Sequence, residues 1–250
     1  MLKMKMLKNK KFISLMIILA VMTATTLAAF AATPSVQTSE AQAVFEGSPK
    51  GNAIWNDSLA KYRSDDKVRH LIFVQWEQSS SIASIQVYQK EKNCKNAWTM
   101  ILECPGYVGR TGVKADKKEG DSATPYGDFG VLTAFGIKRN PGTKLDWVDV
   151  TEDIWCPDGN VPDYNKIVNA KKGGSAQGEM LIKYSPQYNY GMFLDYNKDG
   201  VYGAGSAIFF HCVGPLRYTG GCVAVSEKNM KRILKVFGRD DRVIIAPYTK

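Results

Sequence analysis

The chain has 250 residues, of which 44% are hydrophobic and 23% charged, and its net charge at pH 7 is +9. Five lysines precede residue 12 with no acidic residue among them, so the rest of the chain carries only +4. That charge suits attraction to an anionic surface and is too small to indicate a nucleic-acid partner. With two histidines and no C-x-x-C pair, the sequence also argues against a zinc site.

The N-terminal segment has the three parts of a secretory leader. Its lysines precede an apolar stretch over residues 12–27, which ends on the small residues at 29–32. This pattern predicts a signal peptide over residues 1–31, cleaved after Ala31 or Ala32. The protein is then secreted or cell-wall associated and meets a membrane only through the leader. The alternative is an uncleaved anchor helix, which the apolar length barely permits.

The next two segments differ in composition. Residues 32–66 are rich in Ala, Ser, Gln and Asn and predict a flexible spacer with a short helix near residues 53–62. Residues 67–250 suffice for one sizeable core. Short β-branched and aromatic runs between polar clusters predict a β-meander followed by further strands. The predicted strands cover residues 70–76, 84–89, 98–102, 129–135, 191–196, 206–210 and 242–246.

Residues 138–190 lose this periodicity and are rich in Pro, Gly, Asn, Asp and Lys, with scattered aromatic residues. Compact domains seldom carry so long a stretch without regular structure, so we interpret it as an insertion or cap that faces a substrate. The alternative is a surface excursion whose aromatic side chains pack on the sheet.

One helix is predicted after these strands. Ser226 is a favoured N-cap residue, apolar residues follow at 230, 233, 234 and 237, and Gly238 marks the end. The helix begins only four residues after Cys222, where the positive end of the helix dipole would favour a thiolate.

The chemistry-bearing residues are a histidine and a cysteine close in sequence. His211 ends the apolar run at 208–210, and Cys222 follows the Thr219-Gly220-Gly221 turn. Cysteine acyl transfer needs an imidazole base, a thiol and free backbone N–H groups that face an oxyanion. Taken singly, each residue is more often structural. The second histidine, His70, has no nearby motif and is interpreted as structural.

The five cysteines leave two alternatives open. Because their number is odd, at least one is unpaired within the chain; four of them could form two disulfides in any of three connectivities. Cys94 and Cys104 could close a small loop. Alternatively, all five, including Cys156, Cys212 and Cys222, are reduced thiols.

Two motifs resemble those of the YkuD-type L,D-transpeptidases. Residues 124–130, Thr-Pro-Tyr-Gly-Asp-Phe-Gly, are similar to the T-P-x-G-x-F motif of that family. Residues 211–222 are similar to its closing motif, in which a histidine is followed by Ser or Thr, one residue, and Gly-Cys. The resemblance implies a mainly β fold, a β-sandwich or distorted barrel with one helix on its C-terminal side. Residues 138–190 are then a large loop insertion.

The resemblance also implies roles for individual residues. Cys222 would be the nucleophile and His211 its general base. The carbonyl of Cys212 would orient the imidazole, and the N–H groups of Gly221 and Cys222 would face the oxyanion. The remaining candidates are Thr219, which matches the Ser or Thr of the motif, and Arg217 and Tyr218 as substrate-binding residues.

The implied activity is cysteine-dependent transpeptidation of peptidoglycan tetrapeptide stems, which forms 3→3 cross-links. It involves no cofactor and no metal. The chain departs from the family at Gly220, where a second histidine is usual, and at Ala224, where Arg or Asn is usual. One alternative is therefore an L,D-carboxypeptidase with the same nucleophile. The other is a non-catalytic module that binds the cell wall.

Overall fold

The computed structural model describes residues 44–45, 53–78, 80–92 and 97–247. The expected signal peptide, most of the expected spacer and Cys94 lie outside these residues. The chain divides into two units, residues 1–41 and 42–250, and every described residue belongs to the second. Within the described residues, no helix is long and apolar enough to cross a membrane.

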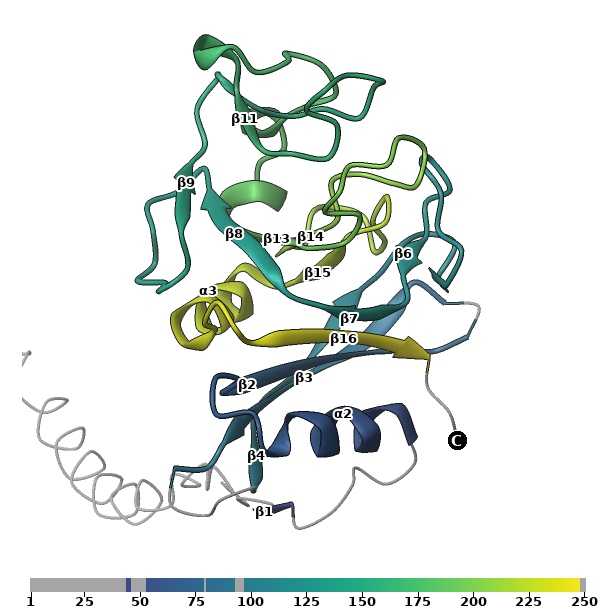
Figure 1. The fold of residues 1–250 in the computed structure, drawn as a ribbon, viewed down its shortest axis with the longest axis vertical. Coiled ribbons are helices and arrows are strands. Elements are labelled where there is room, and N and C mark those ends of the chain that lie inside the picture. Colours follow the sequence, from purple (N-terminus) through teal and green to yellow (C-terminus); the bar gives the residue numbers. More distant parts are fainter. Residues whose placement is uncertain (1–43, 46–52, 79, 93–96, 248–250) are drawn as a thin grey trace, which may run out of the picture. The chain divides into compact units, whose positions relative to one another are not determined.

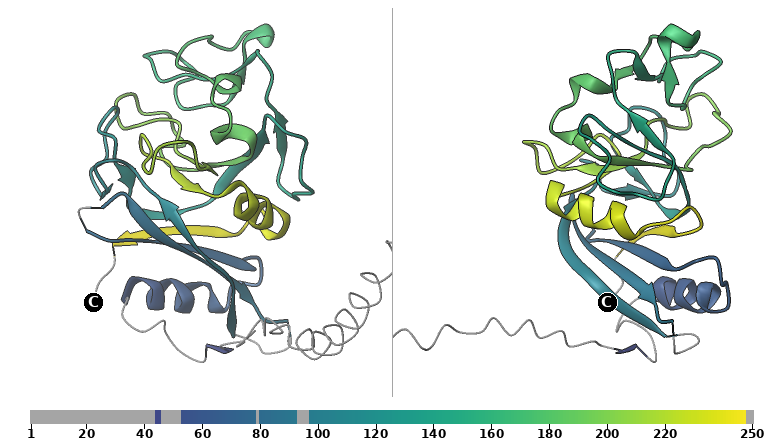
Figure 2. Two further views of the ribbon diagram at one scale, coloured as in Figure 1. Left: turned by 180° about the vertical axis from the view of Figure 1, so that it is seen from behind. Right: turned by 90° about the vertical axis from the view of Figure 1, so that its left-hand side faces the viewer.

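The protein is mainly β, as predicted, and most of its strands form one curled sheet (Figures 1 and 2). The two end strands are β7 and β9, and the short β1 (Val44–Phe45) pairs separately with β4. In spatial order the sheet contains β7 (Gly127–Phe129), β16 (Arg242–Pro247), β2 (His70–Trp76), β3 (Ile82–Lys90), β4 (Trp98–Tyr107), β15 (Val223–Val225), β14 (Phe209–Cys212), β13 (Gly191–Leu194), β8 (Val131–Gly136) and β9 (Trp147–Asp149).

The predicted meander is confirmed as β2, β3 and β4, which pair antiparallel in chain order. Alternation along β2 serves two cores, because successive side chains of a strand point to opposite faces. Ile72 and Val74 belong to the main core, whereas Leu71 and Phe73 belong to a second core on the other face. The C-terminal β16 lies between β2 and β7, parallel to β2.

Several predicted strands differ in their bounds, and two of the differences have a clear local cause. The run over 129–135 is interrupted at Gly130, whose N–H donates to Asp195 Oδ1 at 2.8 Å, so that β7 pairs with β16 and β8 with β13. The run over 206–210 becomes extended only at Phe209 because Ala207 has a φ of 53°. A positive φ lies outside the extended region, so the strand begins only after Ala207.

The short helix expected near residues 53–62 is present as α2 (Ala53–Arg63), and it belongs to the folded unit. Trp55, Leu59 and Tyr62 are buried in the second core. Asp128 Oδ2 accepts hydrogen bonds from Tyr62 at 2.6 Å and from Lys61 at 2.9 Å. Apolar residues at helical spacing therefore attach the last part of the expected spacer, residues 53–63, to the sheet.

The second helix, α3 (Glu227–Val236), has the predicted position and cap. Ser226 is the N-cap and accepts a hydrogen bond from the Asn229 amide at 3.3 Å. Met230, Ile233 and Leu234 are buried in the main core. The amphipathic stripe in the sequence is thus the face that packs on the sheet.

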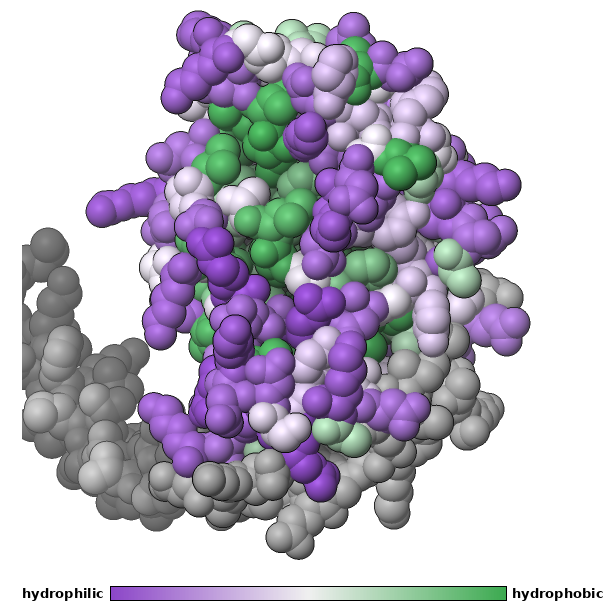
Figure 3. All heavy atoms as spheres, viewed as in Figure 1, coloured by the Kyte–Doolittle hydropathy of each residue, from purple (hydrophilic) through white to green (hydrophobic). Residues whose placement is uncertain are grey.

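Residues 138–190 contain more regular structure than the sequence suggested. Three short strands form a small second sheet in the order β11 (Val168–Asn169), β10 (Ile154–Cys156) and β12 (Glu179–Met180). Three 3-10 helices follow or precede them, η1 (Ala170–Lys172), η2 (Leu181–Lys183) and η3 (Gln187–Asn189). In Figure 1, β9 lies beside β8 at the edge of the main sheet, and the part of the segment around β11 lies beyond the end of β8. Hydrophobic side chains gather over β8 and toward this part of the segment in Figure 3.

This segment is anchored through aromatic packing. The Tyr188 ring makes edge contacts with Phe135 at 5.6 Å and with Phe209 at 5.3 Å between ring centroids. Cys156 and Leu181 are buried in the same cluster. The packing of aromatic residues on the sheet, one of the two alternatives for this segment, therefore occurs.

Candidate active site

Two threonines from distant motifs fix the main chain of Cys222. Thr219 Oγ1 donates to the Cys222 carbonyl at 2.6 Å and accepts the Gly221 N–H at 3.1 Å. Thr124, on β6 (Thr124–Pro125), donates to the same carbonyl at 3.1 Å and accepts the Gly109 N–H at 2.8 Å. Thr124 is fully buried. The motif at 124–130 and the turn at 219–222 therefore meet at one backbone carbonyl.

The two glycines before Cys222 differ in what their positions demand. Gly221 has a φ of 146°, and a Cβ atom there would lie 2.8 Å from the carbonyl oxygen of Ala123. The Ala123 backbone cannot move aside for a Cβ atom, and residues with a side chain rarely adopt this φ. Position 221 therefore requires glycine. Gly220 has open space within 4 Å of a Cβ position.

The thiol of Cys222 is held by backbone groups on both sides. It donates to the Ala207 carbonyl at 3.1 Å and accepts the Phe209 N–H at 3.3 Å. Burial and, to a smaller extent, the charge of Glu179 raise the pKa of Cys222 to about 12, and the hydrogen bond from the Phe209 amide opposes this shift. The thiol is therefore protonated at neutral pH in the empty site.

A side chain of the 138–190 segment forms a hydrogen bond with Ala207, whose carbonyl accepts the Cys222 thiol proton. Asn165, which is 2% exposed, accepts the Ala207 N–H at 3.0 Å through its side chain. Ala207 has the positive φ described above, which is uncommon for a residue other than glycine. The Asn165 bond helps keep Ala207 in this conformation, which directs its carbonyl to the thiol.

The imidazole of His211 is neutral and has one nitrogen free. Its Nδ1 lies 2.7 Å from the Cys212 carbonyl. Because a carbonyl only accepts, Nδ1 carries the proton and Nε2 is left as a base. Burial lowers the pKa of His211 to about 4, and the bond to Cys212 opposes this shift. The edge of the Tyr188 ring packs against the imidazole at 5.4 Å.

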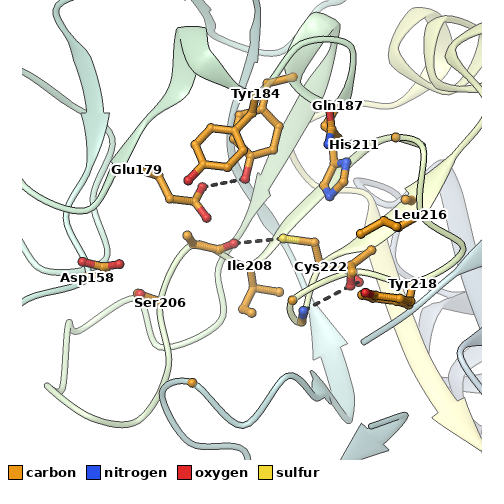
Figure 4. A pocket seen from close by; sticks show the side chains of 18 of the residues that line it. Asp158, Glu179, Tyr184, Gln187, Ser206, Ile208, His211, Leu216, Tyr218 and Cys222 are labelled. Atoms are coloured by element: carbon orange, nitrogen blue, oxygen red, sulfur yellow. Dashed lines mark hydrogen bonds between the residues drawn. The ribbon is translucent and has the colours of Figure 1, made fainter. Parts of the chain in front are cut away.

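His211 and Cys222 line the same cavity of about 340 Å³ (Figure 4). The size suits a small ligand or part of a peptide. Among the described residues, no hydrogen bond joins the imidazole to the thiol. With pKa values of about 4 and about 12, the imidazole and the thiol are both neutral at pH 7.

The backbone donors near the thiol differ from what the resemblance implies. The Gly221 N–H is occupied by Thr219 Oγ1, so it is not free to face an oxyanion in this state. The expected role of Gly221 as an oxyanion donor is therefore not met, because the threonine that fixes the turn uses its N–H. The Cys222 N–H has no acceptor among the described residues and remains available.

The other predicted residues divide between the cavity and the surface. Thr219, Gly221 and Tyr218 line the cavity with His211 and Cys222. Cys212 contributes through its carbonyl, as described above. Arg217 is exposed and outside the cavity lining, and its carbonyl accepts Ser81 Oγ at 2.8 Å. The structure thus brings together all predicted site residues except Arg217.

Three acidic residues of the cavity were missed by the sequence analysis: Glu119, Asp158 and Glu179. Glu179 accepts a hydrogen bond from the Tyr188 hydroxyl at 2.5 Å. Burial raises the pKa of Glu179 to about 7, and the charges of Asp158 and Glu119 add to this effect. No motif marks these residues, which come from separate loops and from β12. Residues 138–190 supply Asp158 and Glu179, so this segment faces the cavity as well as packing on the sheet.

The described part of the chain was expected to hold neither a zinc site nor a fixed set of disulfides. It contains no group of three or more His, Cys, Asp or Glu side chains that could hold a metal ion. The four cysteines that the structure describes, Cys104, Cys156, Cys212 and Cys222, are free and buried. The proposed Cys94–Cys104 loop involves a residue outside the described ranges.

No protein-family model matches the sequence, and no curated protein matches it. Two solved structures are similar to the chain at low identity. The helical cell shape determining protein Pgp2 from Campylobacter jejuni is 15% identical, with a TM-score of 0.39, over 78% of this chain and 56% of that one. A fused Zn-dependent amidase/peptidase/peptidoglycan-binding domain-containing protein from Clostridium acetobutylicum is 13% identical, with a TM-score of 0.33, over 76% and 58%. The chain thus spans little more than half the length of each, and likeness at this level decides neither family nor activity.

Proposed function

We propose that this protein is a cysteine acyltransferase of the L,D-transpeptidase type, with Cys222 as nucleophile and His211 as general base. Its substrates would be peptidoglycan tetrapeptide stems, and it would act outside the cytoplasm. The observation that carries the proposal is the meeting of Thr124 and Thr219 at the Cys222 carbonyl, beside the cavity that His211 also lines. The two motifs that resemble the family thus support one turn.

In the proposed mechanism, Sγ of Cys222 attacks the carbonyl carbon of the third stem residue. The thiol proton passes to Nε2 of His211 as the carbon–sulfur bond forms, and the Sγ–H bond to Ala207 is given up. The Cys222 N–H faces the developing oxyanion. When the tetrahedral intermediate collapses, the imidazolium returns its proton to the departing D-alanine, leaving a thioester on Cys222.

The second half of the reaction decides the product. An amine of a neighbouring stem that attacks the thioester forms a 3→3 cross-link and restores the thiol. Water in the same position makes the protein an L,D-carboxypeptidase. The open space at Gly220, where the resembling family usually has a histidine, favours keeping the hydrolytic activity as the second candidate.

The test is to incubate the secreted protein with purified disaccharide-tetrapeptide and to analyse the products by mass. We expect loss of D-alanine, a thioester on Cys222, and either dimers or tripeptides. Cys222→Ala should abolish all three, whereas Cys104→Ala, a buried free cysteine outside the cavity, should retain them. D-alanine release by the Cys222→Ala protein would exclude Cys222 as nucleophile. An inert but folded wild-type protein would instead indicate a binding module.

A further inference from the structure

A buried lysine lies beside the turn that carries Cys222. Lys117 belongs to the loop between β5 (Val113–Lys114) and β6, and its side chain is only 3% exposed. Two glycines leave room for it. A Cβ atom at Gly205 would lie 3.1 Å from Lys117 Cε, and one at Gly221 would lie 3.4 Å from Lys117 Nζ. The ammonium group therefore lies against the residue that precedes the nucleophile.

The hydrogen bonds of Lys117 hold the ammonium group in place and leave it one donor. Its Nζ donates to Asp121 Oδ1 at 2.9 Å and to the Lys118 carbonyl at 3.1 Å. Asp121 is itself held by the amides of Lys118 and Ala123, each at 2.9 Å. An ammonium group has three N–H bonds, so one of them has no acceptor among the described residues. Since Lys117 lines the Cys222 cavity, this donor suits an anionic oxygen that arrives with the substrate.

The site also has fewer backbone donors for an oxyanion than the resemblance implies. Thr219 Oγ1 occupies the Gly221 N–H, which leaves the Cys222 N–H available. Side chains and backbone N–H groups can share the role of oxyanion donor. Burial raises the pKa of Cys222 to about 12, and the charge of Lys117 acts in the opposite direction. The ammonium group therefore favours negative charge at the reacting atoms.

We propose that Lys117 is a further catalytic residue, whose third N–H bonds the oxyanion formed when Cys222 attacks the substrate carbonyl. The inference rests on the proposed function and deepens it. As the carbon–sulfur bond forms, the electron pair of the C=O π bond moves to the oxygen, which the Cys222 N–H and Lys117 Nζ then bond. When the intermediate collapses, this pair restores the carbonyl and the bond to D-alanine breaks. Lys117 keeps its proton throughout. Because the ammonium group is buried, solvent screens its charge less than at the surface.

The first test is the kinetics of D-alanine release from disaccharide-tetrapeptide. Lys117→Gln removes the charge, and Lys117→Met has a side chain of similar length that needs no acceptor, so it serves where the Gln variant does not fold. We expect kcat to fall about 10²–10³-fold, the usual effect of removing one oxyanion donor, and KM to stay within about twofold. Lys118→Gln is the matched control, because it removes an adjacent charge outside the cavity and should retain kcat. A folded Lys117 variant with kcat within twofold of wild type would overturn the inference.

The second test measures the bonded oxygen without turnover. A stem peptide that ends in an aldehyde at its third residue adds reversibly to the Cys222 thiol, and the oxygen of the adduct takes the place of the oxyanion. We expect Lys117→Gln to weaken this adduct about tenfold or more, as for a charge-assisted hydrogen bond. Calorimetry should give the same Kd for disaccharide-tetrapeptide with Cys222→Ala protein and with the protein that carries both substitutions.

The same measurements separate other roles of Lys117. If it bonded the carboxylate of the terminal D-alanine, the tetrapeptide would bind about tenfold more weakly without it, and the aldehyde, which lacks that carboxylate, would be unaffected. If it were structural, both ligands would bind more weakly to the same extent. Either result would overturn the inference.

The wild-type protein distinguishes failure of the inference from failure of the proposed function. A folded wild-type protein that forms neither a thioester nor an aldehyde adduct would refute the proposed function, and the role of Lys117 with it. A wild-type protein that releases D-alanine through Cys222, with an equally fast Lys117→Gln variant, would refute the role of Lys117 alone.

Discussion

One side of the Cys222 cavity is built from the main chain, whereas the opposite side depends on side chains. Thiol and imidazole bond to backbone groups of Ala207, Phe209 and Cys212. Across the cavity, Glu119 and Glu179 are held by side-chain hydroxyls. A backbone frame fixes reacting atoms with little freedom, while a side-chain wall can change charge without disturbing the fold. The two sides of the cavity therefore differ in what a single substitution can change.

The largest expected effect is on the backbone-framed side. His211→Gln removes the base, so D-alanine release should fall by about 10²–10⁴, the usual contribution of general base catalysis. Turnover of the disaccharide-tetrapeptide measures it. His70→Gln is the matched control, since His70 bonds Asp241 and does not line the cavity. Activity of the His211→Gln protein within twofold of wild type would make His211 a structural residue.

Acid should affect the two sides in opposite directions. Because burial lowers the pKa of His211 to about 4, the unfolded chain takes up a proton between pH 6.5 and 4 that the folded protein refuses. The free energy of unfolding therefore falls by up to about 3 kcal/mol as pH falls through this range. Glu179 has a pKa raised to about 7, so it binds its proton more tightly in the folded protein than in the unfolded chain. Its contribution to the free energy of unfolding therefore rises as pH falls from 7 toward 4.5.

Urea unfolding at pH 7 and pH 4.5 resolves these contributions. The His211→Gln protein should lose less stability on acidification than wild type, and the Glu179→Gln protein should lose more. Identical losses in all three proteins would show that neither group titrates as its environment indicates.

Gly220 and Gly221 differ in whether their positions leave room for a side chain. Gly221→Ala should lower the free energy of unfolding by about 1–3 kcal/mol, because of its φ and its contact with the Ala123 carbonyl. Gly220→Ala should stay within about 0.5 kcal/mol of wild type, since open space surrounds it. Urea unfolding measures both. A Gly220→Ala loss as large as that of Gly221→Ala would contradict the difference assigned to the two positions.

The smallest expected effect is that of Glu179 on the reactivity of the Cys222 thiol, on the other side of the cavity. The charge of Glu179 raises the pKa of Cys222, so Glu179→Gln should lower that pKa and speed alkylation by iodoacetamide at pH 8. The gain should be about two- to fivefold, because a thiolate of lower pKa is also less nucleophilic. Peptide mapping assigns the modified cysteine, and Glu152→Gln, in the same segment and outside the cavity, should leave the rate unchanged. Slower or equal alkylation would mean that the charge of Glu179 does not affect the pKa of the Cys222 thiol.

Sequence patterns predicted the elements whose cause is local. Periodicity predicts both β2 and the stripe at Met230, Ile233 and Leu234, because burial follows from position in a strand or helix. The short helix within the expected spacer is present as α2, and Trp55, Leu59 and Tyr62 have the helical spacing that accounts for its burial in the second core.

The predictable part of the site was the part with short motifs. Cys222, His211 and Thr219 were identified from a few adjacent letters and a family resemblance, and they line one cavity. The cavity carboxylates Glu119, Asp158 and Glu179 span 60 positions of the chain, so no short sequence motif contains them. The occupied Gly221 N–H could not be foreseen either, because it depends on the rotamer of the Thr219 hydroxyl.

The place of β16 has a consequence for how the chain reaches its native state. The last strand lies between β2 and β7, and Arg242 on it bonds Asp128 at 2.8 Å, the same carboxylate that holds Lys61 and Tyr62 of α2. The first helix and first long strand of the folded unit therefore gain their full set of partners only when the final residues have been delivered. Such non-local pairing slows folding.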